Sequence, residues 1–377
     1  MFQNSMAVES TSQPERIAAS HRVAPPDLAR AASGSSTQDR RAVLGLILAT
    51  TSIRVLLAAN LGLGIDESYT VATGRHPQLS TFDHPPLAWW LSWMAAGVLG
   101  SESALSVRLP FIGLFAVTTW LMYSLTSRLY GSRAGLWAAV TLNLIPVLAW
   151  TSGTWVLPDG PLNAALLAGA ICVAAALFGQ SSRAPIWWLA AGIAGGLALL
   201  SKLHGLLLFA GVGLFLVTSP GYRRWLASPW PYAGLALAIV VFLPVLVWNA
   251  QHRWVSFAFQ AGRAHARDLQ IWGPALALAG QAAVLLPWLW LPLMICLAHA
   301  AWSGPTKERD WLLVCLAIGP IVVFTAVGLT GSRVLPHWAA PGYLMLVPLL
   351  GRAVAEAICA GNRLVRGWLI ASAASVA

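Results

Sequence analysis

The chain has 377 residues, of which 58% are hydrophobic and only 10% are charged, and its mean hydropathy is +0.69. Soluble globular domains carry about 25% charged residues, so this composition excludes that class and indicates a chain whose solvent is largely lipid. The net charge of +10 comes from basic residues scattered through short segments, which argues against a nucleic-acid partner and is explained by membrane orientation.

Residues 1–41 precede the apolar part of the chain. They are polar, mixed in charge and rich in Ser, Ala and Gln, and they contain no apolar core of a signal peptide. We therefore expect a disordered cytoplasmic tail. The cysteines lie inside apolar runs without a CxxC pair, which predicts neither disulfides nor metal ligands.

From residue 42 onward, apolar runs recur at near-constant intervals. Each is close to the ~20 residues that cross a bilayer as a helix. Backbone polar groups in lipid must be satisfied within the segment, so we predict an all-α polytopic membrane protein with about 10 to 11 transmembrane helices. The spans that we place are about 42–61, 109–127, 134–150, 162–179, 186–201, 203–218, 231–248, 274–299, 311–330 and 340–351.

Basic residues indicate the orientation of these spans. Arg40 and Arg41 precede the first span, so the N-terminus is expected in the cytoplasm and Gly62 outside. Alternation then makes residues 62–108 one long outer loop. Within it, PPLAWWLSWMAAGVLG is short for a span and rich in Trp, which predicts a helix lying along the membrane surface.

The first outer loop carries two acidic motifs. Asp66 and Glu67 follow the first span, where partial desolvation can tune a carboxylate to act as a general base; alternatively, they are two solvated acids at a helix end. In FDHPPL the prolines open a helix that Asp83 can cap. His84 is not explained by capping, so it is either a hydrogen-bonded structural residue or part of a site.

Two later outer positions also carry ionisable groups. Asp159, in LPDGPL, is either a turn residue or an acid that holds a basic residue or a substrate hydroxyl. Lys202 and His204 interrupt a largely apolar stretch, and ionisable residues at such depth by default face a cavity. The alternative is snorkelling at the apex of a helical hairpin.

Outer cations gather in the loop 249–273, against the positive-inside trend. Arg253 and Arg263 lie there among aromatic residues, and Arg333 and His337 follow in a later outer segment. Arg binds phosphate in a bidentate manner and Trp can anchor an isoprenoid or acyl chain, so the loop predicts an anionic lipid headgroup as ligand. A solvated amphipathic helix would explain the alternation of charge but not the excess of one sign.

Taken in order, these motifs resemble those of a known family. DE at 66–67, FDHPPL, LPDGPL, SKLHG, WNAQHRWVSFAFQ and PHW follow one another as in the bacterial membrane glycosyltransferases related to the protein O-mannosyltransferases and the lipid A aminoarabinose transferase. The resemblance covers about residues 42–350. It implies the GT-C fold for a transmembrane domain over 42–377, and we expect the C-terminal periplasmic domain common in that family to be absent.

The resemblance also implies an activity and a site. It implies transfer of a sugar, with inversion, from a polyprenyl-phosphate donor to a lipid, protein or glycan acceptor on the periplasmic face of a bacterial inner membrane. Asp66 matches the catalytic acid that acts as base, and Glu67 its neighbour. With the outer polar residues above, the predicted substrate-binding set is Asp83, His84, Asp159, Lys202, His204, Arg253, Arg263, Arg333 and His337.

The chemistry is consistent with this division of residues. The transition state resembles an oxocarbenium ion, and a phosphate leaving group needs cations and no protonating acid. Because the candidate ligands have no tight metal spacing, no metal or other cofactor is predicted. Two other classes compete: a transporter or flippase for an anionic lipid, and a scaffold protein of the membrane.

Overall fold

The computed structural model describes residues 26–263, 268–332 and 334–375, with side chains from residue 36. Over these ranges the chain is helical and contains no β-strand, so the predicted all-α fold class is confirmed. The α-helices are α1 Pro26–Asn60, α2 Ile65–Gly74, α3 Leu87–Leu99, α4 Ala104–Tyr130, α5 Ser132–Leu144, α6 Asp159–Phe178, α7 Ala184–Ser201, α8 Leu206–Thr218, α9 Pro229–Gln251, α10 Val255–Gly262, α11 Gly273–Leu285, α12 Pro287–Ser303, α13 Glu308–Ala326, α14 Ala340–Cys359 and α15 Arg363–Ala374.

Within the described part of the chain, seven helical segments are long and apolar enough to cross a membrane, and two bent pairs raise the number to nine. The predicted span 274–299 is one of these pairs, since α11 and α12 meet at an angle of 116°. Leu286, between them, precedes Pro287 and has a φ of 71°. A residue before proline is driven out of the helical region, so a single straight helix could not continue here.

The predicted span 134–150 is also interrupted. Helix α5 ends at Leu144, and Ile145 is extended because Pro146 follows it. A π-helical turn, η1 (Val147–Thr151), continues the chain. The interruption matters because η1 forms part of the cavity described below.

The centre of the bundle is built from helices that approach closely. Helix α6 is the most buried of the candidate spans, with 83% of its apolar window inside the protein. Gly192 of α7 and Gly234 of α9 meet backbone to backbone, and a Cβ at Gly192 would lie 2.1 Å from the Gly234 carbonyl oxygen. Small residues of this kind let transmembrane helices pack tightly.

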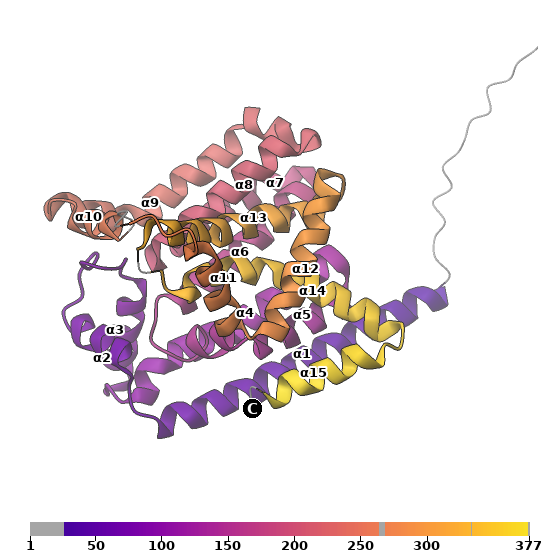
Figure 1. Ribbon diagram of the computed structural model, residues 1–377, viewed down its shortest axis with the longest axis horizontal. Helices are drawn as coiled ribbons and strands as arrows, with labels where there is room; N and C mark the ends of the chain where they lie inside the picture. The colour runs from indigo at the N-terminus through magenta and orange to yellow at the C-terminus, as the bar shows by residue number, and fades with distance from the viewer. Residues whose placement is uncertain (1–25, 264–267, 333, 376–377) are drawn as a thin grey trace, which may run out of the picture.

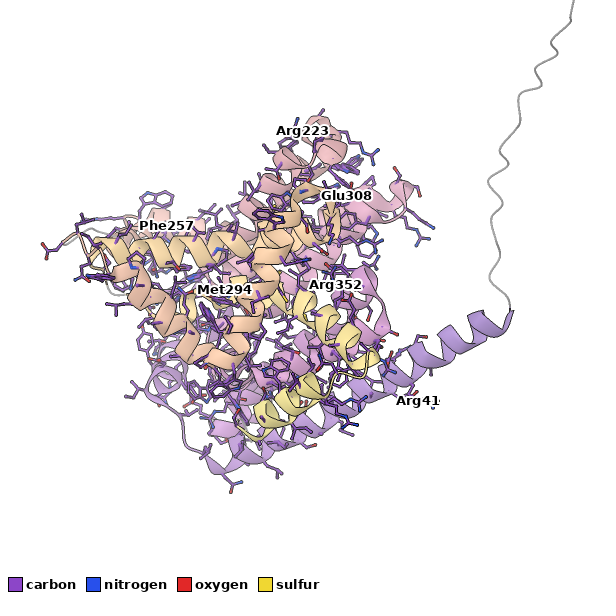
Figure 2. The ribbon with its side chains drawn as sticks, turned by 45° about the vertical axis from the view of Figure 1, so that its right-hand side comes forward. Arg41, Arg223, Phe257, Met294, Glu308 and Arg352 are labelled. Carbon is purple, nitrogen blue, oxygen red and sulfur yellow. The ribbon has the colours of Figure 1, made fainter. Side chains whose placement is uncertain are left out.

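Helices α2, α3 and α10 lie together at one end of the bundle, and the start of α1 lies toward the other (Figure 1). Arg41, Arg223 and Arg352 lie away from Phe257 of α10 (Figure 2). The ion pair between Arg352 Nη1 and Asp310 Oδ1, at 2.8 Å, joins α14 to α13. The four cysteines are free, as predicted.

Candidate functional site

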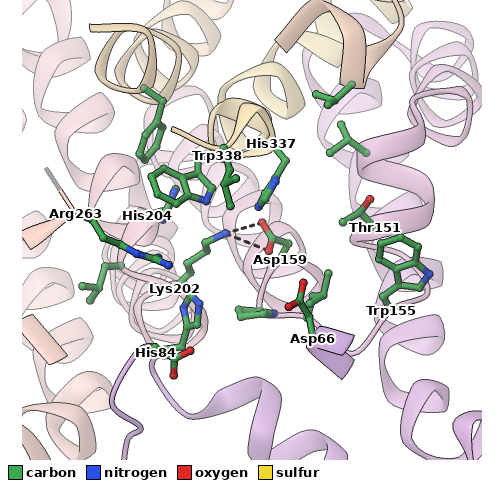
Figure 3. Close-up of a pocket in the computed structure, with 18 of the residues that line it drawn as sticks. Asp66, His84, Thr151, Trp155, Asp159, Lys202, His204, Arg263, His337 and Trp338 are labelled. Carbon is green, nitrogen blue, oxygen red and sulfur yellow. Dashed lines mark hydrogen bonds and ion pairs between the residues drawn. The ribbon is translucent and has the colours of Figure 1, made fainter. Parts of the chain in front are cut away.

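A cavity of about 1010 Å³ opens where several segments of the chain meet. Five segments contribute to its wall: the N-terminus of α2, the loop before α3, the start of α6, the α7–α8 turn and the segment before α14 (Figure 3). The predicted site residues that line it are Asp66, Asp83, His84, Asp159, Lys202, His204, Arg263 and His337. Residues far apart in the sequence are therefore brought to one site.

Asp66 lies in the first turn of α2 and faces this cavity. The helix starts after Gly64, and an acid in the first turn interacts favourably with the helix dipole. Within the described residues its carboxylate has no hydrogen bond or ion pair, and the residue is exposed. An unengaged carboxylate in a cavity is free to accept a proton from a bound molecule.

Glu67 points away from the cavity into the protein. Its carboxylate forms an ion pair with Arg108, whose Nη2 lies 2.6 Å from Oε2, and both side chains are 4% exposed. It also accepts hydrogen bonds from the backbone N–H groups of Gly64 and Val156, at 2.9 and 3.1 Å. Burial opposes ionisation, but these donors hold the pKa of Glu67 below its usual value. Glu67 therefore joins α2 to Arg108 of α4 and to the backbone at Val156, and it does not line the cavity.

Asp159 and Lys202 form a buried ion pair on the cavity wall. The Lys202 Nζ lies 3.0 and 3.2 Å from the two carboxylate oxygens of Asp159. Lys202 sits in an extended break between α7 and α8, where Gly205 is required because a Cβ there would lie 2.7 Å from the backbone of Ala198. The pairing agrees with the interpretation of Asp159 as an acid that holds a basic residue. The position of Lys202 agrees with the interpretation that this residue faces a cavity.

The FDHPPL motif is held by α2 and α10. Asp83 Oδ1 accepts hydrogen bonds from the Tyr69 hydroxyl at 3.2 Å and the Thr81 hydroxyl at 3.1 Å, and Gln260 donates to its carbonyl. The N-cap of α3 is Pro86, without a side-chain hydrogen bond, so the prediction that Asp83 caps this helix is wrong. Its side chain is instead already engaged by the neighbouring hydroxyls.

His84 is half-buried against the ring of Trp89, with the ring centroids 5.8 Å apart. Burial, together with the nearby charge of Lys202, lowers the pKa of His84 to about 4. The imidazole is therefore neutral at neutral pH and can donate one hydrogen bond and accept another.

Aromatic rings and basic groups form the far wall of the cavity. His204 stacks on Phe324 at 4.6 Å between ring centroids, and its Nε2 has no partner within the described residues. Arg263 lies over the rings of Phe259 and Trp338, at 4.8 and 5.5 Å. No acid among the described residues forms an ion pair with Arg263, which lines the cavity, so its guanidinium can bind an anion there.

Two predicted cations are not part of the cavity as described. Arg253 is exposed, has a φ of 55° and does not line it. Arg333 lies outside the described residues. No group of three or more His, Cys, Asp or Glu side chains within the described ranges is arranged to hold a metal ion.

Sequence reasoning missed several residues around the site. The aromatic wall formed by Trp150 and Trp155 was not predicted, and neither were the structural roles of Arg54 and Arg108. Arg54 is 3% exposed and lies in the C-terminal part of α1, within the predicted span 42–61. A charge inside a predicted span is a signal that could have found it.

Residues 83–248 match the family described as dolichyl-phosphate-mannose-protein mannosyltransferase. The chain is also 25% identical over 285 residues to the lipid A galacturonosyltransferase RgtD of Rhizobium johnstonii, which covers 74% of this chain. The alignment takes in 58% of that relative, so the chain spans less than two thirds of its length.

Solved structures give the same assignment of fold. One is ArnT from Cupriavidus metallidurans bound to undecaprenyl phosphate, with a TM-score of 0.66 and 16% sequence identity. The match covers 82% of this chain and 60% of the ArnT chain. Another is the oligosaccharyltransferase AglB from Archaeoglobus fulgidus, with a TM-score of 0.50 and 14% sequence identity. This match covers 85% of this chain and 52% of the AglB chain. The resemblance and the GT-C fold predicted from the sequence are confirmed.

Proposed function

We propose that this chain, a PMT-like protein with the GT-C fold, is a membrane glycosyltransferase that takes its sugar from a polyprenyl-phosphate donor. The observation that carries the proposal is the cavity, in which the unengaged carboxylate of Asp66 faces a wall that holds Lys202 and Arg263. Such a site combines a proton acceptor with cations for a phosphate. The family match and the likeness to a structure bound to undecaprenyl phosphate support it.

The proposed reaction is one displacement with inversion at the anomeric carbon. The acceptor oxygen or nitrogen attacks that carbon while its proton passes to the Asp66 carboxylate. The bond between the anomeric carbon and the phosphate oxygen breaks, and its electron pair stays on the phosphate. Lys202 and Arg263 stabilise the charge that develops there, so no acid has to protonate the leaving group.

The neighbouring residues prepare the site for this step. Neutral His84 can hydrogen-bond a sugar hydroxyl or a phosphate oxygen without adding charge. Asp159 holds the Lys202 ammonium in place at 3.0 Å before the donor arrives. An apolar wall that includes Val323, Phe324 and Val327 adjoins these groups and suits the isoprenoid chain.

The positions of the arginines support an orientation for the reaction. Arg41, Arg223 and Arg352 lie away from the outer helices, as positive-inside residues do (Figure 2). We place the cavity at the periplasmic face of a bacterial inner membrane and the N-terminus in the cytoplasm. The acceptor is a lipid, protein or glycan.

Reconstituted protein and a panel of radiolabelled polyprenyl-phosphate sugars test the proposal. Wild type should release or transfer the sugar from at least one donor, and Asp66→Asn should not. Asp268→Asn, which changes an exposed acid outside the cavity lining, should behave as wild type. Movement of intact donor across the bilayer without sugar transfer would instead identify a lipid transporter.

A further inference from the structure

The cavity has a second wall that the proposed chemistry does not use. Thr151 and Trp155 lie on the side of Asp66 away from Lys202 and Arg263 (Figure 3), and Trp150 lines the cavity with them. Trp155 is 46% exposed, so a large aromatic surface is left open to a ligand. A wall of two indoles and a hydroxyl beside a catalytic base provides shape and hydrogen bonds but little charge.

Arg54 holds this wall in position. It reaches from α1 to the π-helical turn η1, where its Nη2 donates to the Ala149 carbonyl at 3.2 Å. Its guanidinium also lies over the rings of Phe115 and Trp150, at 4.3 and 5.4 Å. A π-helical turn leaves carbonyl groups without regular helical partners, and Arg54 satisfies one of them. The shape of η1 is therefore supported by a buried cation.

Glu67 connects the same wall to the base. It follows Asp66 in α2, and its Oε1 accepts the N–H of Val156, which follows Trp155, at 3.1 Å. The ion pair with Arg108 anchors Glu67 itself at 2.6 Å. One buried carboxylate thus ties the backbone beside Trp155 to the backbone beside Asp66. This connection keeps the aromatic wall at a constant place relative to the base.

We propose that the wall of Trp150, Thr151 and Trp155 binds the acceptor, and that the acceptor is a saccharide. This inference rests on the proposed function. In an inverting displacement the attacking group approaches from the side opposite the leaving phosphate. Lys202 and Arg263 mark the phosphate side, so the acceptor approaches along the aromatic wall.

The chemistry of the wall favours a sugar over other acceptors. An indole packs against the apolar C–H face of a sugar ring, while its N–H and the Thr151 hydroxyl can bond ring hydroxyls. Apart from Asp66, the side chains on this side of the cavity carry no charge. A sugar hydroxyl placed over Trp155 would lie next to Asp66, which accepts its proton.

The test measures binding and transfer separately. A soluble glucosamine disaccharide is the probe, and a serine-containing hexapeptide is the competing acceptor. Saturation-transfer NMR measures disaccharide binding, which we expect Trp155→Ala to weaken by about ten-fold. The KM for the disaccharide in the transfer reaction should rise by a similar factor. The affinity for the donor should stay within about two-fold of wild type. Trp155→Phe should recover part of the loss. Trp302→Ala, at a side chain that is 94% exposed elsewhere, should match wild type.

Two results would overturn the assignment of the wall. One is disaccharide binding that is absent from wild type or equal in wild type and Trp155→Ala. The other is transfer to the hexapeptide that does not depend on Trp155. Failure of the proposed function gives a different result. Wild type would then transfer sugar from no donor, although NMR would still measure whether the disaccharide binds and whether binding depends on Trp155.

Discussion

Replacing Glu67 with alanine removes the acceptor of four hydrogen bonds: two from Arg108 and one each from the backbone N–H groups of Gly64 and Val156. Both side chains of the ion pair are 4% exposed, so water cannot replace the lost partner without local opening. Breaking such a buried pair typically destabilises a protein by about 3–5 kcal/mol. That energy corresponds to a roughly 2 × 10²- to 5 × 10³-fold increase in the population of the open form.

Amide hydrogen exchange in detergent or nanodiscs measures this opening directly. Exchange at Gly64 and Val156 should be about 2 × 10²- to 5 × 10³-fold faster in Glu67→Ala than in wild type. Glu102→Ala is the matched control, since the Arg75–Glu102 pair has the same chemistry and a similar 2.6 Å distance but side chains that are 59% and 40% exposed. It should change exchange little.

The pH dependence provides an internal check. The folded-state pKa of Glu67 lies below its usual value, so the unfolded state binds more protons than the folded state as the pH falls. Protection at Val156 is therefore complete above the unfolded pKa and is lost as the pH falls through the folded one. Exchange in Glu67→Ala should lack this dependence. Protection in that variant within about ten-fold of wild type would refute the role given to the buried pair.

Three further predictions concern other parts of the site and fold. His84 has a pKa lowered to about 4 from 6.5, so its contribution to stability is complete above pH 6.5 and is lost as the pH falls to about 4; His84→Gln should flatten the melting temperature over that window. Asp159→Asn and Lys202→Met should each destabilise the bundle by about 3–5 kcal/mol, and the double variant by clearly less than their sum in thermal unfolding. Trp368→Phe should increase hydrogen exchange in α15, because the indole N–H of Trp368 donates at 2.9 Å to the Trp288 carbonyl of α12. Pro292 has no N–H, so that carbonyl lacks its usual partner within the helix. Trp302→Phe, at an exposed side chain, should leave this exchange unchanged.

The apolar periodicity was sufficient to predict the fold class, because length and hydropathy determine which segments can cross a bilayer. The breaks were harder to predict. Pro146 and Pro287 interrupt predicted spans, yet Pro244 and Pro348 lie inside the continuous helices α9 and α14. Neighbouring helices can satisfy the backbone groups freed by a proline, so tertiary packing decides which proline bends the chain.

The site could be predicted where an ionisable residue stood out against apolar sequence. Lys202 and Asp159 are examples, and the structure pairs them. Glu67 shows the limit of this reasoning, since adjacent acids look alike in sequence although Asp66 faces the cavity and Glu67 faces Arg108. One step along a helix turns a side chain by about 100°, and only the packed neighbours decide which of the two is buried.

The central claim is that Asp66 takes the proton from the attacking acceptor and is not needed to hold the donor. Donor affinity and single-turnover transfer should be measured on the same preparations of wild type, Asp66→Asn and Asp268→Asn, with a polyprenyl-phosphate sugar that wild type uses. We predict that Asp66→Asn binds the donor within a few-fold of wild type and transfers at least about 10²-fold more slowly, whereas Asp268→Asn matches wild type in both. Transfer by Asp66→Asn at the wild-type rate would contradict the account.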